Sequence, residues 1–108
     1  MADPLTIHAS DKYGPSISFA CGALVIDDAV RATGHEPNGY FWESVARFVA
    51  TDTLAALEVD CEAGTFAAYG DRDLLEQLRN SLRPYLTDGA RVTELVARAE
   101  AEGFEFDD

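Results

Sequence analysis

The sequence has few basic residues and no long apolar segment. Eight Lys and Arg residues stand against 20 Asp and Glu residues in 108, which gives a formal net charge of −12. This charge disfavours binding to nucleic acid and to anionic lipid. No apolar run exceeds four residues, so we expect no membrane-spanning segment. The start, Met1–Pro4, has neither the basic nor the apolar stretch of a secretory signal, and we therefore expect a cytoplasmic protein.

Common catalytic and cofactor-binding motifs are also missing. The chain has no phosphate-binding or dinucleotide-binding glycine loop, no zinc-protease motif and no serine-hydrolase elbow. His8 and His35 lack metal-ligand spacing. Cys21 and Cys61 fall in apolar alternations, which is typical of reduced core thiols. We therefore expect no enzyme, no catalytic residue, no metal and no cofactor.

Against these absences, the chain is rich enough in apolar residues to fold. Apolar residues make up 47% of the sequence, and 11 aromatic residues are spread along it. This excludes a disordered acidic chain, because such chains cannot offset the entropy cost of ordering. No repeat, linker or low-complexity stretch divides the sequence. We expect one domain over 1–108, with frayed ends at 1–4 and 107–108.

Hydropathy patterns predict the elements of the first half. Alternating residues predict strands at 5–9 and 16–21, joined as a hairpin, and residues 24–26 are expected to prolong the second strand. Asp27 and Asp28 should cap a short helix that runs to Thr33 and closes at Gly34. Asn38 should cap a longer helix that ends near Asp52, with apolar residues on one face: Phe41, Trp42, Val45, Phe48 and Val49.

The second half predicts a hairpin followed by helices. Strands over 57–62 and 65–69 should be joined by a turn at 62–64. Asp71 should cap a helix that Pro84 ends or kinks, and a last helix should follow 88–89 and close at Gly103. The tail 104–108 is either a frayed end or a docked extended segment, such as a sheet-edge strand. The fold class is α+β, an antiparallel sheet of about four strands in two hairpins, covered on one face by about three helices.

Two clusters carry chemical character. Glu58, Asp60 and Glu62 share one strand face, where like charges repel unless cations oppose them. They form a solvated surface, a binding face for Arg and Lys, or a metal site. The segment 38–43 is aromatic. Phe41 and Trp42 are about 100° apart on a helix, so both are not expected at the centre of one face. Either both are core residues, or Tyr40 or Trp42 is partly exposed as an interface anchor.

Three segments resemble the immunity protein 51 family of bacterial polymorphic toxin systems. Gly39-Tyr40-Phe41-Trp42-Glu43 is similar to the family's G-Y-x-W-E segment. Residues 60–69 are similar to its D-x-E-A/G-x-x-F-x-A-Y segment, except that Cys61 stands where Pro or another turn-compatible residue is expected. The sequence Phe106-Asp107-Asp108 matches its F-D-D ending. The resemblance covers residues 15–108 in order and spacing.

The resemblance implies a non-enzymatic inhibitor that binds a cognate toxin domain, for instance a basic nuclease, by electrostatic and steric occlusion. The expected partner-binding residues are Tyr40, Trp42, Glu43, Glu58, Asp60, Glu62, Tyr69, Asp71, Asp73, Glu105, Asp107 and Asp108. Two alternatives stay open at this point. One is a small metal-binding or enzymatic module that uses Glu43, Asp60 and Glu62, and the other is an acidic adaptor subunit.

Overall fold

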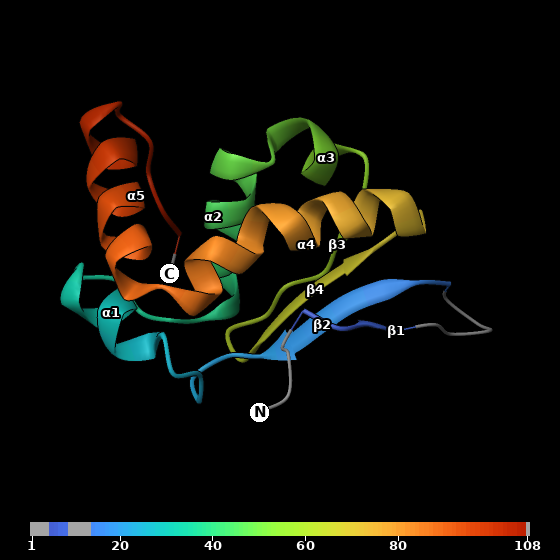
Figure 1. Ribbon diagram of the computed structural model, residues 1–108, viewed down its shortest axis with the longest axis horizontal. Helices are drawn as coiled ribbons and strands as arrows, with labels where there is room; N and C mark the ends of the chain where they lie inside the picture. The colour runs from blue at the N-terminus through green and yellow to red at the C-terminus, as the bar shows by residue number, and fades with distance from the viewer. Residues whose placement is uncertain (1–4, 9–13, 108) are drawn as a thin grey trace.

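The computed structural model describes residues 5–8 and 14–107 (Figure 1). Its strands are β1 (Ile7–His8), β2 (Ser16–Ala20), β3 (Glu58–Val59) and β4 (Thr65–Tyr69). Its helices are α1 (Asp27–Ala32), α2 (Gly39–Val49), α3 (Thr51–Ala55), α4 (Arg72–Thr87) and α5 (Gly89–Ala101). The predicted α+β class is confirmed. The described residues contain five helices rather than about three, because two short ones add to the longer α2, α4 and α5.

The four strands form one antiparallel sheet in the order β1-β2-β4-β3. The two predicted hairpins, β1–β2 and β3–β4, are both present, and they join through β2 and β4. In that central pair Ile17 lies opposite Ala68, and Phe19 lies opposite Phe66. All four are buried, so this face of the sheet forms the floor of the core.

The β3–β4 hairpin follows its prediction closely. Glu58 pairs with Tyr69, and the same register continues to a bridge between Glu62 and Thr65. That register leaves a two-residue turn at 63–64. The strand label ends at Val59, but the backbone N–H of Asp60 still donates to the carbonyl of Ala67 at 3.0 Å.

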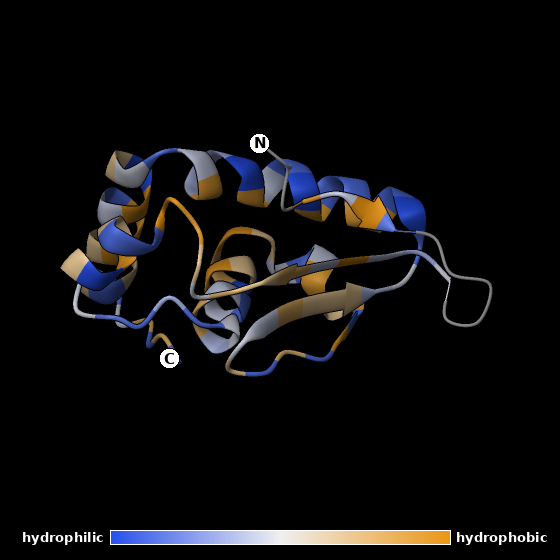
Figure 2. Ribbon diagram, turned by 90° about the horizontal axis from the view of Figure 1, so that it is seen from below, coloured by the Kyte–Doolittle hydropathy of each residue, from blue (hydrophilic) through white to orange (hydrophobic). Residues whose placement is uncertain are grey.

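The helices cover one face of the sheet. Helices α2 and α4 pack against the central strands, α3 lies by β3, and α5 packs on α1 and α4 (Figure 1). Seen from below, the strands are uncovered (Figure 2). The leucine stripe of α4 is buried as predicted, with Leu75, Leu78 and Leu82 fully covered. Within the described ranges, every helix is too short or too polar to cross a bilayer.

Helix α2 is covered on two sides, which the sequence does not reveal. Asn38 caps it as predicted, because its side chain accepts from the N–H of Phe41 at 2.9 Å. Phe41 and Trp42 are both fully buried. The Trp42 ring meets Phe19 of the sheet, while the Phe41 ring stacks on Phe106 of the tail. The two rings are therefore both core residues that are covered from different sides, in agreement with the expectation that they do not share the centre of one face.

Two predicted boundaries are wrong, and one of the two alternatives for Pro84 is excluded. Helix α2 ends at Val49 rather than near Asp52, because Ala50 has non-helical dihedral angles (φ −141°, ψ 48°). Residues 24–26 do not prolong β2, and the Asp27 carboxylate accepts from the N–H of Leu24 instead. Pro84 does not end α4, which continues to Thr87. Proline at this position lacks the N–H that would donate to the carbonyl of Asn80, so the helix continues with one backbone hydrogen bond fewer.

The tail is docked and extended, but not at a sheet edge. Phe104 packs against Phe48, and Phe106 lies between Phe41 and His35. The N–H of Asp107 donates to the Ser44 hydroxyl at 2.9 Å. Position 107 is therefore held rather than frayed. The other predictions for the ends, at 1–4 and 108, and for Ala9 lie outside the described residues.

Candidate protein-binding face

The side of the sheet away from the helices is small, polar and acidic. Phe66 and Ala68 point to the core, and alternate residues of a strand point to opposite faces. The register then places one group of residues on the far side, which we call the outer sheet face: His8, Ser16, Ser18, Ala20, Glu58, Asp60, Glu62, Thr65, Ala67 and Tyr69.

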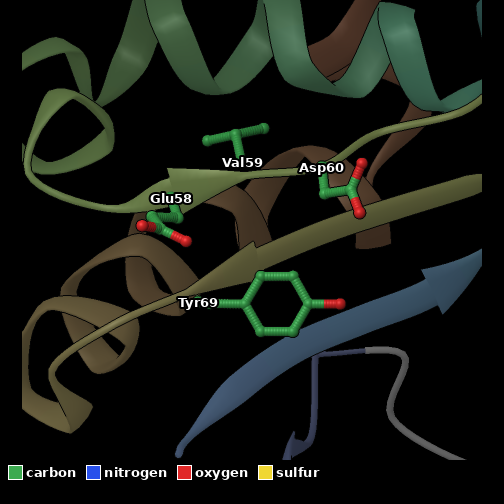
Figure 3. A pocket seen from close by; sticks show the side chains of 4 residues that line it. All are labelled: Glu58, Val59, Asp60 and Tyr69. Carbon is green, nitrogen blue, oxygen red and sulfur yellow. The ribbon is translucent and has the colours of Figure 1, made fainter. Parts of the chain in front are cut away.

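The hairpin side of the outer sheet face is hollowed. Glu58, Val59, Asp60 and Tyr69 line a groove of about 590 Å³ (Figure 3). Glu58 lies directly opposite Tyr69 in the ladder. In Figure 3 the two carboxylates lie on the side of the Tyr69 ring, while the Val59 side chain points away from it. The groove thus combines two acids with one aromatic ring.

The acids of the outer sheet face have no compensating cation among the described residues. Glu58, Asp60 and Glu62 are exposed and form no ion pair there. None of the four strands contains Lys or Arg, and all seven arginines of the chain lie in helices. The chain's one lysine, Lys12, is outside the described residues. Among the described residues, therefore, no basic side chain neutralises the negative charge of this face.

Two further predicted acids lie close by in the chain. Asp71 and Asp73 are exposed and follow Tyr69, whose ladder partner is Glu58. Asp71 occupies the N-cap position of α4, although its side chain makes no capping hydrogen bond. The two residues therefore come directly after the strand end that pairs with Glu58. The Asp71 carboxylate forms no hydrogen bond with the backbone of α4.

The other predicted acids belong to a different place. Arg47 of α2 contacts the Glu43 carboxylate at 3.0 Å and that of Asp107 at 4.0 Å. These two acids are thus partly neutralised, and they lie on the helical side of the sheet. Glu105 is exposed on the docked tail. The structure therefore does not bring the tail acids onto the outer sheet face, and Asp108 lies outside the described residues.

The three predicted aromatic anchors differ in exposure. Tyr40 is 41% exposed, and Tyr69 is half-buried on the outer sheet face. Trp42 is 0% exposed. Its role as an interface anchor is a wrong prediction, because the sheet and the first turn of α2 enclose the indole.

The alternative metal site is not assembled among the described residues. Glu43, Asp60 and Glu62 do not form a group that could hold a metal ion, and no such group of three ligands occurs in the described part of the chain. Burial raises the pKa of Cys21 to about 11 and that of Cys61 to about 12, and the nearby carboxylates of Asp27 and Glu43 add to the two increases respectively. Both groups are therefore neutral thiols near pH 7 rather than nucleophilic thiolates.

The three segments that carry the family resemblance meet around α2. The N–H of Gly39 donates to the carbonyl of Ala63 in the hairpin turn, and a Cβ at position 39 would overlap the backbone oxygens of Glu62 and Thr65. The tail closes on the same helix through Phe106. The sequence reading assigned no role to Gly39 or Ser44, although a glycine at a helix start can signal such a close approach.

Comparisons of the chain with known protein families, with curated proteins and with solved structures gave no match.

Proposed function

We propose that the chain is an immunity protein, a non-enzymatic inhibitor that binds a cognate toxin domain in the cytoplasm of the producing bacterium. The observation that carries this proposal is the outer sheet face. Its exposed acids have no cation beside them among the described residues, so they are available to a basic partner. A net charge of −12 gives the whole chain the sign that such a partner requires.

The inhibitor acts by occupying the partner's functional surface. Glu58, Asp60 and Glu62 pair with Arg and Lys of the toxin domain, and Tyr69 supplies an aromatic contact between them. Asp71 and Asp73 extend the contact beyond the end of β4. Removing one member of a buried interfacial charge pair costs about 2–5 kcal/mol of binding free energy, so few such pairs suffice.

The partner is a basic domain, for instance a nuclease. A nuclease binds phosphates with Arg and Lys, and carboxylates held at strand spacing offer the same residues an alternative anionic ligand. Occupying that surface blocks the substrate without any chemistry on the inhibitor's side.

The family resemblance supports the proposal, and the structure gives its segments a physical role. Gly39, Phe41, Trp42 and Phe106 pack α2 between the hairpin and the tail. These residues build the scaffold, whereas the outer sheet face supplies the contact. One scaffold can then serve different partners through changes of exposed side chains that contribute little to the core.

A rescue assay tests the proposal. The C-terminal domain of the large reading frame beside this gene is expressed in a naive bacterial host, alone and with this chain. We expect the domain to kill alone and growth to return with the wild-type chain. A killing domain against which the wild-type chain gives no protection would contradict the proposal. Co-purification without protection would instead indicate an adaptor subunit.

The assay includes two variants of equal charge change. The face variant carries Glu58→Gln, Asp60→Asn and Glu62→Gln. The control variant neutralises three exposed acids on or next to helices: Asp52, Glu94 and Glu102. We expect the face variant to lose protection and the control to keep it. Full protection by the face variant would show that the three acids of the outer sheet face are not needed to bind the toxin domain.

A further inference from the structure

The free edge of the hairpin exposes backbone groups that have no partner in the described part of the chain. β3 is an edge strand, paired only with β4. The N–H groups of Asp60 and Glu62 donate toward β4, to Ala67 and Thr65. Because successive backbone groups of a strand point to opposite sides, those of Val59 and Cys61 point away from β4. No hydrogen bond engages them within the described ranges.

The strand at this edge also presents an amphipathic set of side chains. Its residues Glu58, Val59 and Asp60 line the groove of about 590 Å³ together with Tyr69 of β4. The Val59 and Cys61 side chains pack partly against the core on the inner side, while the three acids project on the outer side. A strand added here would have one face toward carboxylates and the other toward apolar groups.

We infer that the β3 edge binds an extended segment of the basic partner as a fifth strand of the sheet. The segment carries Arg or Lys at every second position, on the side of Glu58, Asp60 and Glu62, and apolar residues between them. Hydrogen bonds to the backbone of Val59 and Cys61 hold the segment. This inference rests on the proposed function and specifies how the partner is bound.

Charge selects this occupant over a second copy of the chain. Two β3 edges brought together would place six carboxylates on one sheet face, where like charges directly opposite each other are destabilising. A basic segment turns the same carboxylates into partners. The charges therefore disfavour pairing between two copies of β3 and favour pairing with a cationic strand.

Two synthetic peptides test the inference. One alternates Arg and Val over eight residues, and the other has the same composition with four Arg followed by four Val. Both are titrated into the ¹⁵N-labelled protein, and amide hydrogen exchange is measured. We expect the alternating peptide to slow exchange of the Val59 and Cys61 amides at least about tenfold, because each amide gains a hydrogen bond. The block peptide should bind more weakly.

Two variants at position 59 distinguish the contribution of the backbone N–H to peptide binding from that of the side chain. Val59→Pro removes the outward N–H, and Val59→Ala keeps it. The ladder bonds to β4 are made by the neighbouring residues, so both variants should fold. We expect Val59→Pro to bind the alternating peptide about tenfold more weakly than Val59→Ala. If Val59→Pro does not fold, the exchange measurement on the wild-type protein still tests whether the peptide binds at the β3 edge.

Three results would overturn the inference: no binding of the alternating peptide, equal binding of both peptides, or binding that leaves exchange at Val59 and Cys61 unchanged. The proposed function fails separately. If the toxin domain is neutralised but its binding does not protect these two amides, only the edge inference is wrong. If the peptide adds as a strand but no toxin domain is neutralised, only the immunity proposal is wrong.

Discussion

Neutralising Asp60 should make the free protein more stable while it weakens partner binding. Asp60 lies between Glu58 and Glu62 on the outer sheet face, and its side chain has no ion pair or hydrogen bond within the described residues. Asp60→Asn therefore removes two repulsions and sacrifices no described interaction. A surface evolved only for stability would not retain such a residue, whereas a binding surface can.

The spacing of the three acids gives the expected change in the free energy of unfolding. Alternate residues of a strand are about 7 Å apart, so each pair repels by about 0.6 kcal/mol in water at low salt. The substitution should therefore raise the free energy of unfolding by about 1 kcal/mol at low salt. At physiological ionic strength, where the Debye length is about 8 Å, the gain should fall to about 0.5 kcal/mol.

Urea denaturation at 10 and 500 mM salt measures this effect. Asp28→Asn is the matched control, because Asp28 is 99% exposed but contacts Arg31 at 3.4 Å in the first turn of α1. Its neutralisation should give no gain in stability. The reasoning is refuted if Asp60→Asn is destabilising, or if its gain is as large at high salt as at low salt.

Three other perturbations test the scaffold. Gly39→Ala should cost about 1–3 kcal/mol because its Cβ would overlap hairpin oxygens. In contrast, Gly64→Ala faces open space and should change stability by less than about 0.5 kcal/mol in the same urea measurements. Phe106→Ala should cost about 2 kcal/mol and speed amide exchange in the tail. The free energy of unfolding should fall between pH 9 and 12. The unfolded chain loses thiol protons near 9.0, whereas Cys21 and Cys61 hold theirs to about 11 and 12 in the folded protein. Denaturation curves from pH 8 to 11 measure this fall, which Cys61→Ala should reduce.

Each of these predictions has a contrary outcome. Equal stability of the two glycine variants would mean that α2 does not depend on close contact with the hairpin. Unchanged exchange in the tail of the Phe106 variant would show that the ring does not hold it. An alkaline stability curve that is the same with and without the Cys61 thiol would contradict the role assigned to its burial.

Local patterns predicted much of the fold because they depend on neighbours in the chain. The hairpin of β3 and β4 follows from period-two alternation around a small turn, and the Asn38 cap follows from the chemistry of a helix start. The acids at 58, 60 and 62 were correctly expected on one strand face for the same reason. That no cation opposes them in the described part of the chain was not predictable, since it depends on every arginine being placed in a helix.

Non-local packing accounts for what the sequence reading missed. Trp42 packs against Phe19 of β2 and Phe41 packs against Phe106 of the tail, so two segments distant in sequence cover the start of α2. Asp107 is separated from the outer sheet face because the tail returns to α2, where Arg47 contacts it and Glu43 of the same helix. Periodicity within one element says which face is apolar. It does not say how many neighbours cover that element.

The placement of every arginine on the helices also makes the two sides of the molecule different for a cationic partner at short range. Arginines lie among the acids of the helical layer, while the described part of the sheet carries acids without Lys or Arg. A cationic surface that meets the helices therefore faces charges of its own sign as well as carboxylates, whereas at the described part of the sheet it faces carboxylates alone. Encounters on the sheet side should last longer, which shortens the rotational search that normally limits how often an encounter becomes a complex.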